Sequence, residues 1–256
     1  MVPVWQEAGI EVTEIFGIRK APPADVAFLH IDLSVIPPAY LEFARCYPVA
    51  INGSVADIRK SRLSILRVDL RSGYSGPVIV KSSHNFAGNP ERFFFHNRSR
   101  LQRLFTRKPT LPSYPIRLES KADYRIYENA TEVPAAVWTC DDLVVEKFMP
   151  ERHGDLYCLR EWYFCGSENF QWVELSSDPI FTAGQQAHHL QVPLPPELPA
   201  LREKLGFDYG KFDFTMVDGR PVVFDFNKTT GLMNPQGKEI GSVARQLAGG
   251  IAGYFR

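Results

Sequence analysis

An acid and an amide stand two residues apart in the run VVFDFNKTTG, residues 222–231, near the end of the chain. If the run is a β-strand, its side chains alternate between two faces. Asp225 and Asn227 then share one face. Phe224 and Phe226 share the other, which can seal a core. Neighbouring carboxylate and amide oxygens are ligands that Mg²⁺ or Ca²⁺ uses, so the pair predicts a metal site or, alternatively, the solvent-facing edge of a hairpin.

A second carboxylate, Asp213, belongs to the same expected hairpin, residues 211–227, which turns at an Asp-Gly pair. A three-residue loop would place Asp213 and Asp225 on one face as near neighbours. A two-residue loop would place them on opposite faces unless a β-bulge restores the phase. Pro221 beside the turn favours the first alternative. Two carboxylates so close repel each other, and a bound divalent cation relieves that repulsion.

Two more charged side chains end apolar, strand-like runs. Lys81 ends the run GPVIVK and is followed by a loop that contains Gly88. A lysine beside such a loop suits phosphate oxygens, whereas the plainer interpretation is a strand-end lysine whose head lies in solvent. Glu146 ends the run LVVE before a Phe-Met-Pro segment. That segment is either a plain strand end or an apolar surface with backbone groups for a flat base.

The composition indicates a globular chain without a strong charge preference. Of its 256 residues 45% are hydrophobic and 23% are charged, with 29 Lys plus Arg against 29 Asp plus Glu. A zero net charge argues against a protein that coats nucleic acid or anionic membrane. Residues 92–118 are rich in Arg and contain no acid. They predict a solvated helix face or a basic lip for anionic ligands.

The sequence also predicts a cytoplasmic location. The first 20 residues lack the basic start and apolar core of a signal peptide, and no stretch approaches the roughly 18 apolar residues of a membrane span. The four cysteines form no CxxC pair, and no histidine stands at zinc-ligand spacing from them. Buried, reduced thiols are the expected state.

The order of apolar, Pro and Gly residues predicts an α+β chain. Residues 25–53 indicate a strand, a Pro-opened helix and a second strand, which form a small α/β unit. A short buried strand is expected before the Lys81 loop and a β-rich run around Glu146. The remaining expected elements are helices at 54–68, 195–207 and 237–255 and hairpins at 159–175 and 211–227.

In this order the segments resemble the ATP-grasp superfamily, which includes D-alanine–D-alanine ligases, glutathione synthetases and the ligases that add glutamate to a ribosomal protein. The resemblance covers about residues 50–235, and it rests on the succession of motifs because no single motif is specific. The matching motifs are Lys60, Lys81 with NFAGNPE, VEKFM, Arg160, Asp213 and DFNKTTG.

The resemblance implies an ATP-grasp fold, in which two α/β lobes with largely antiparallel sheets sandwich ATP. A short α/β pre-grasp unit over residues 1–57 would precede the grasp. The lid lobe would then span residues 58–149, and the lobe that holds Mg²⁺ and the catalytic groups would span residues 150–256.

The resemblance also implies the residues of the site. Mg²⁺ or Mn²⁺ ions would be held by Asp213, Asp225 and Asn227, and Lys81 and Arg160 would be catalytic. The ribose contact stays open between Glu151 and Asp155. The other implied contacts to ATP are Lys60, Lys81, Asn85, Gly88, Glu146, Lys147, Phe148 and Met149.

The activity implied is that of an ADP-forming ligase. ATP would phosphorylate a small-molecule or peptide carboxylate, and an amine or thiol would attack the acyl phosphate, with Arg160 stabilising the negative charge. A kinase that phosphorylates a hydroxyl and a nucleotide-binding scaffold without turnover are the alternatives. Nucleic acid and membrane partners are not expected, and the choice between monomer and homodimer stays open.

Overall fold

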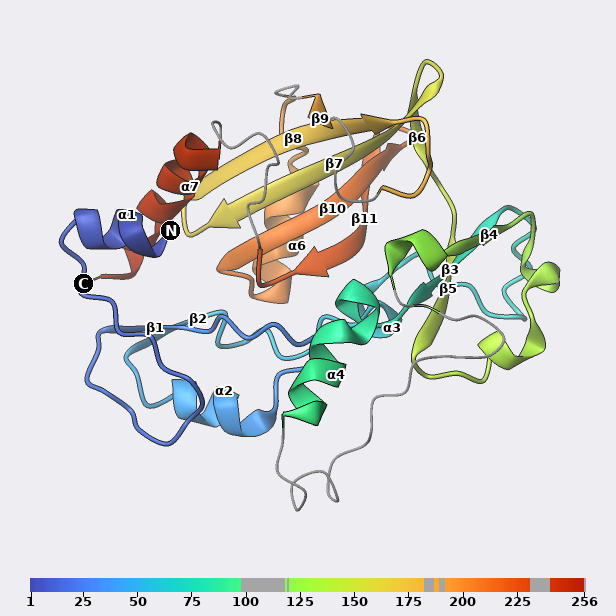
Figure 1. The fold of residues 1–256 in the computed structure, drawn as a ribbon. Helices are drawn as coiled ribbons and strands as arrows, with labels where there is room; N and C mark the ends of the chain where they lie inside the picture. The colour runs from blue at the N-terminus through green and yellow to red at the C-terminus, as the bar shows by residue number, and fades with distance from the viewer. Residues whose placement is uncertain (98–117, 119, 182–186, 189–191, 231–239, 256) are drawn as a thin grey trace.

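The computed structural model describes residues 1–97, 118, 120–181, 187–188, 192–230 and 240–255. Within them the chain forms a two-stranded sheet, a three-stranded sheet and a six-stranded sheet, flanked by short helices (Figure 1). The two larger sheets are antiparallel, which confirms the α+β prediction. None of the described helices combines the length and apolarity that crossing a membrane requires.

The N-terminal unit contains strand β1 (Val26–Phe28), helix α2 (Pro38–Ala44) and strand β2 (Val49–Ile51). The two strands pair in parallel, and α2 begins with proline in its first turn, as expected of a residue that lacks a backbone N–H. The predicted strand–helix–strand unit is therefore confirmed.

Asn52, directly after β2, links this unit to the large sheet through hydrogen bonds. The residue is fully buried and has a left-handed φ of 60°. Its Nδ2 donates a hydrogen bond to the Tyr209 carbonyl at 2.8 Å, and its Oδ1 accepts from the backbone N–H groups of Asp208 and Tyr209. A single amide side chain thus satisfies three backbone groups across the junction.

The three-stranded sheet has β3 (Val78–Ser82) in the centre, between β4 (Arg125–Tyr127) and β5 (Leu143–Lys147). All five residues of β3 are buried, which confirms the predicted strand before the Lys81 loop. The connections around the sheet contain the short 3₁₀ helices η1 (Asn85–Gly88), η2 (Lys121–Asp123), η3 (Ala130–Glu132) and η4 (Ala135–Val137).

The helix predicted over residues 54–68 is wrong except for one turn, α3 (Lys60–Leu63). Asp57 Oδ1 accepts hydrogen bonds from the backbone N–H and the guanidinium of Arg59, and this local pairing competes with helical bonding. Helix α4 (Asn89–His96) is the described start of the predicted basic segment. The rest of residues 92–118 lies almost entirely outside the described residues.

The six-stranded sheet has the order β11-β10-β7-β8-β9, with β6 paired to β7. Both predicted hairpins are confirmed: β7 and β8 join at Gly166-Ser167, and β10 and β11 join at Asp218-Gly219. The strands are β6 (Glu151–His153), β7 (Leu156–Cys165), β8 (Glu168–Ser176), β9 (Ala187–His188), β10 (Tyr209–Val217) and β11 (Arg220–Asn227).

Opposite faces of this sheet have different coverings. One face packs on the predicted helix α6 (Glu197–Leu205) through a core of Leu198, Trp162, Phe164, Phe207, Phe212, Phe214, Val223 and Phe226. At one end of the other face lie α7 (Ile240–Gly249), the following η5 (Gly250–Tyr254) and α1 (Val2–Glu7), which bring the two chain ends close together (Figure 1).

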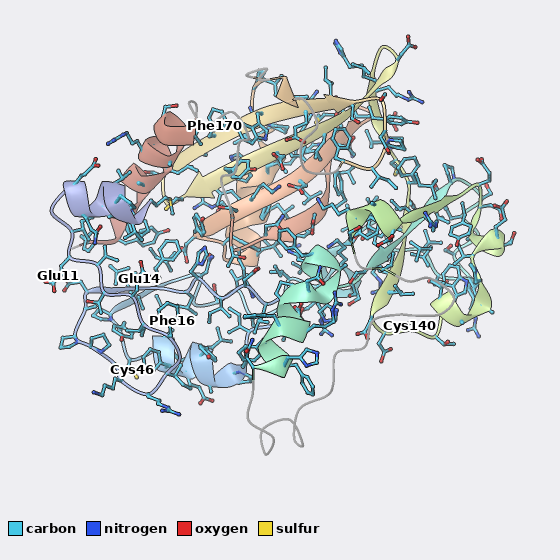
Figure 2. All side chains as sticks on the ribbon, viewed as in Figure 1. Glu11, Glu14, Phe16, Cys46, Cys140 and Phe170 are labelled. Atoms are coloured by element: carbon cyan, nitrogen blue, oxygen red, sulfur yellow. The ribbon has the colours of Figure 1, made fainter. Side chains whose placement is uncertain are left out.

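The cysteines are all free thiols, and two of them are buried. Burial raises the pKa of both Cys158 and Cys165 to about 11, so these thiols stay protonated at neutral pH. Cys46 is exposed, which contradicts the expectation of uniform burial. Cys46 and Cys140 lie in separate parts of the molecule, too far apart to pair (Figure 2).

Candidate active site

A cavity of about 820 Å³, its open mouth included, lies between the three-stranded and six-stranded sheets. Six of the residues expected at the site line it: Lys60, Lys81, Lys147, Phe148, Met149 and Asp225. The apolar part of the wall includes Leu66, Ile79, Leu159, Ile180, Phe181 and Phe224.

A β-bulge brings the two aspartates together. The hairpin turns through two residues, because Val217 pairs directly with Arg220, and Pro221 does not prevent this ladder. The register then shifts next to Asp213, which becomes the direct cross-strand partner of Asp225. The favoured three-residue loop is therefore wrong, and the alternative of a two-residue loop with a bulge is confirmed.

The bulged residue is Phe224, and it changes the expected face assignment. Val223 and Phe226 belong to the buried core, whereas Phe224 lines the cavity beside Asp225. The Lys81 ammonium lies 4.9 Å from the centre of the Phe224 ring. The expectation that Phe224 fills the core is wrong, because the extra residue ends strict alternation between Val223 and Asp225.

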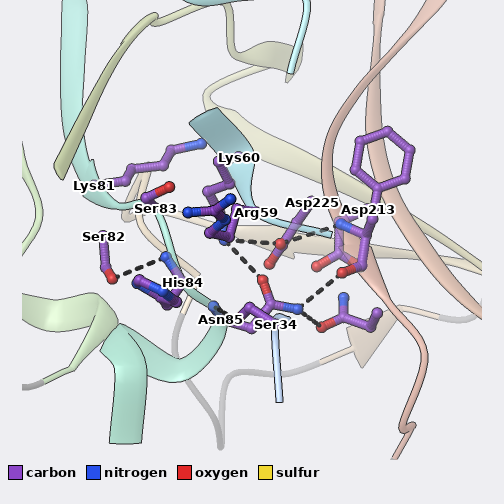
Figure 3. A network of polar contacts seen from close by, with 12 residues as sticks. Ser34, Arg59, Lys60, Lys81, Ser82, Ser83, His84, Asn85, Asp213 and Asp225 are labelled. Atoms are coloured by element: carbon purple, nitrogen blue, oxygen red, sulfur yellow. Dashed lines mark hydrogen bonds and ion pairs between the residues drawn. The ribbon is translucent and has the colours of Figure 1, made fainter. Parts of the chain in front are cut away.

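One polar network connects α3, the loop after β3 and the end of β11. Lys60 Nζ lies 2.9 Å from Asp225 Oδ1 and donates a hydrogen bond to Asn85 Oδ1 at 3.0 Å. Asn85 Nδ2 donates to Asn227 Oδ1 at 3.0 Å and to the Phe226 carbonyl at 2.8 Å. Figure 3 shows the side chains of Lys60, Asn85 and Asp225 pointing toward one another. Lys60, Asn85, Asp225 and Asn227 thus come together as the sequence predicts.

Lys81 and Glu146 form a second buried pair. Lys81 Nζ donates to Glu146 Oε2 at 2.8 Å, and the Glu146 side chain is fully buried. Lys81 itself is buried rather than solvated. Glu146 does not line the cavity, so its side chain acts through Lys81, and the wall beyond β5 consists of Lys147, Phe148 and Met149.

The loop after Lys81 is strained. Phe86 and Ala87 have left-handed φ angles of 48° and 54°, and Gly88 follows with 75°. Two consecutive non-glycine residues in this region are costly and persist only where surrounding contacts hold them, commonly near functional sites. Asn85 provides such contacts, because its backbone N–H donates to Ser34 Oγ at 3.0 Å in addition to the side-chain bonds above. Gly88 is buried but does not line the cavity.

Lys211 and Glu161 belong to the site, although the sequence reasoning missed them. Lys211 Nζ lies 2.8 Å from Asp213 Oδ1 and also forms an ion pair with Glu161. Glu161 is the cross-strand neighbour of Asp213, so all three side chains share one face of the sheet. The signal was present, because Lys211 stands two residues before Asp213 on the same strand.

Burial and these ion pairs shift the pKa values of the charged groups in the site. Burial alone would raise the pKa of Asp225, but the Lys60 ammonium outweighs it and holds that pKa below its ordinary value. Burial lowers and Asp225 raises the pKa of Lys60, with a net increase. The pKa of Asp213 is raised by burial, which Lys211 opposes only in part. Burial raises the pKa of nearby Glu174 to about 7.

The oxygen donors at the end of the hairpin fit a small, hard cation. Asp213, Asp225 and Asn227 offer two carboxylates and an amide oxygen on one face, which is the donor chemistry that Mg²⁺ prefers. Lysine ammonium groups contact both carboxylates. Among the described residues, no group of three or more His, Cys, Asp or Glu side chains is arranged to hold a metal ion.

Arg160 lies on the face of β7 opposite to the face that carries Glu161. Its guanidinium forms a two-pronged pair with Glu151, with Nη2 to Oε1 at 2.6 Å and Nε to Oε2 at 2.8 Å, and its cross-strand neighbour is the core residue Phe214. Asp155 is exposed in the turn between β6 and β7. None of these three polar residues lines the cavity, and neither do Asp213 and Asn227. The catalytic role of Arg160 and the ribose contact by Glu151 or Asp155 therefore stay predictions.

Two other features escaped the sequence reasoning. Lys121 and Tyr124 line the cavity from the η2 region, and nothing in their spacing indicates this. Lys228, directly after β11, is 1% exposed, and its Nζ has no hydrogen-bond partner among the described residues. Burial outweighs the attraction of Glu91 and lowers the pKa of Lys228 to about 8.

No protein-family model matches the sequence, and no curated protein matches it. Solved structures do match. The RimK domain ATP-grasp protein from Sphaerobacter thermophilus is 14% identical with a TM-score of 0.52, over 99% of this chain and 93% of that chain. The D-alanine–D-alanine ligase from Bacillus anthracis complexed with ATP is 14% identical with a TM-score of 0.34, over 71% of this chain and 51% of that chain.

The first of these structures aligns with nearly the whole of both chains and shows the fold. The chain has the ATP-grasp fold, as its sequence predicts. At 14% identity the likeness shows the fold alone, so the activity has to be argued from the residues of the cavity.

Proposed function

We propose that this chain is an ATP- and Mg²⁺-dependent ligase that joins a carboxylate to an amine or thiol through an acyl phosphate. The observation that carries the proposal is the composition of the cavity wall. Lys60 and Lys81 come from the three-stranded-sheet side, Asp225 from the bulged hairpin, and Phe148 and Met149 from the segment after β5. This combination offers cations for phosphates, an apolar wall for a base and a carboxylate for a metal.

In the proposed complex the adenine lies against Phe148 and Met149, and the phosphates lie toward Lys60 and Lys81. Glu146 holds the Lys81 ammonium in place, which reduces the entropy lost on binding phosphate. Mg²⁺, when bound near Asp225 and Asn227, would neutralise the charge of the phosphates during phosphoryl transfer. Arg160 has no part in the reaction.

The proposed substrates are a small-molecule or peptide carboxylate and an amine or thiol acceptor, met in the cytoplasm. Purified protein should release ADP from ATP in the presence of Mg²⁺ and pooled metabolites, and hydroxylamine should trap a hydroxamate. Asn227→Ala controls for contaminating ATPases and should release none. ADP without hydroxamate would indicate a kinase, and no ADP with any pool would indicate a scaffold.

A further inference from the structure

Lys211 is a largely buried cation beside Asp213. Its ammonium lies between two carboxylates, 2.8 Å from Asp213 Oδ1 and ion-paired with Glu161. Its side chain is 15% exposed and Asp213 is 1% exposed. Asp213, which the sequence resemblance implies as a metal ligand, therefore already has a positive partner within the chain.

Several contacts fix this ammonium. Glu161 accepts hydrogen bonds from Trp172 Nε1 and from the Tyr163 hydroxyl, the latter at 3.1 Å. The Lys211 ammonium also lies 5.5 Å from the centre of the Tyr163 ring. Because two aromatic donors hold the Glu161 carboxylate in place, the Lys211 ammonium paired with it is held as well. A surface lysine differs, since its ammonium moves freely in solvent.

The other aspartate has a partner of a different kind. Lys60 belongs to α3, so a movement of that segment can separate Lys60 from Asp225. Lys211 stands two residues from Asp213 on the same strand, and no movement of rigid elements can separate that pair. Mg²⁺ can thus replace Lys60 at Asp225, whereas at Asp213 it would have to bind beside the ammonium of Lys211, which contacts Oδ1 of that carboxylate and repels a second cation.

We propose that Lys211 takes the place of one divalent cation, so that the site binds a single Mg²⁺ with ATP instead of the plural ions that its fold implies. The ion would bind on the Asp225–Asn227 side, while Asp213 and Lys211 form a fixed ion pair beside it. The inference rests on the proposed binding of Mg²⁺ and ATP and concerns the number of ions alone.

The test counts Mn²⁺ ions bound per chain by electron paramagnetic resonance in the presence of a non-hydrolysable ATP analogue. Wild type should bind one ion. The double variant K211M/E161Q removes both members of the buried pair, which preserves folding better than removing one, and it should bind two. Lys211→Arg keeps the charge and should bind one. Lys204→Met, at an exposed residue of α6, is the control and should also bind one.

The outcomes separate the inference from the proposed function. Two ions in wild type, or one ion in a folded K211M/E161Q protein, would overturn the inference and leave ATP binding intact. If wild type binds no Mn²⁺ that depends on the nucleotide, the proposed function fails and the inference fails with it.

Discussion

The two hairpins of the large sheet differ in one residue of register, and this difference decides which side chains reach the cavity. The β7–β8 pair keeps an unbroken ladder from Tyr157 to Cys165. In the β10–β11 pair a bulge at Phe224 moves Asp225 opposite Asp213. Strict alternation is therefore a sound guide to faces in the first hairpin and a false one near Phe224 in the second.

Arg160 and Phe224 each lie on the face of the sheet opposite to the one expected for it. In the regular ladder Arg160 stays on the core side, and its neighbour Glu161 lies on the same face of the sheet as Asp213. In the bulged hairpin Phe224 leaves the core side and joins Asp225 at the cavity. A motif thus fixes which residue types are present, whereas the register decides which of them meet.

The largest expected effect tests the bulge. Phe226→Ala should lower the free energy of unfolding by about 3–5 kcal/mol, because the ring is buried among aromatic side chains. Phe224→Ala should cost about 1–2 kcal/mol, because its ring is partly exposed at the cavity, and should weaken ATP binding instead. Urea denaturation measures both. Equal losses, or a larger loss for Phe224→Ala, would contradict the register.

Lys81→Ala comes next. A solvated strand-end lysine would be removed at little cost, but here the change leaves Glu146 buried without its cation and should cost about 3–5 kcal/mol. Thermal unfolding without ligand measures it, with exposed Lys204→Ala as the control. An unchanged melting temperature would show that the pair contributes nothing to stability.

Asp225→Asn should destabilise the unliganded protein by about 1.5–3 kcal/mol, because Lys60 loses its charged partner. Repulsion between Asp213 and Asp225 alone would predict the opposite sign. Because the pKa of Asp225 is lowered on folding, its contribution is complete above its unfolded pKa and is lost as pH falls through the folded value. The gap between wild type and variant should therefore close in acid, as urea titrations at several pH values can measure.

Lys228→Met should stabilise the protein by about 1–3 kcal/mol at pH 7, because the buried ammonium has no hydrogen-bond partner among the described residues. The folded pKa is about 8, below the ordinary value near 10.5. Wild type therefore gains stability as pH rises between those values, and the advantage of the variant should shrink in the same window. A destabilised variant at pH 7 would show that Lys228 has a stabilising partner.

The smallest effect concerns Arg160. The double variant R160M/E151Q removes both members of a half-buried pair on the core side and should leave ATP affinity and turnover within about twofold, with stability changed by about 1 kcal/mol. Steady-state kinetics measures this. A loss of turnover comparable to that of Asn227→Ala would show that Arg160 takes part in the reaction.

The sequence predicts the hairpins, the α/β unit and most of the polar network well, because these depend on local patterns such as the Gly166-Ser167 turn and the spacing of Asp225 and Asn227. It fails where a side-chain contact competes with helical hydrogen bonding and where partners distant in the chain decide. The helix predicted over 54–68 is prevented by the contact between Asp57 and Arg59, and the positions of Lys121 and Tyr124 depend on how two sheets meet.

The pairing of each aspartate with a lysine is the least predictable feature. Lys60 and Asp225 are far apart in the sequence, and only the fold brings their charged groups within 2.9 Å. Lys211 and Asp213 are close in sequence, but whether a lysine at that position turns to its neighbour or to solvent depends on the Glu161 carboxylate across the strand.

The central claim is that the cavity between the two sheets binds ATP together with a divalent cation. Isothermal titration calorimetry of ATP into the wild-type protein, once with Mg²⁺ and once with chelator, tests it directly. The account predicts binding with Mg²⁺ that weakens by about tenfold or more without it, because a cation held beside Asp225 and Asn227 would neutralise the negative charge of the phosphates. Equal affinity under both conditions, or no binding in either, would contradict it.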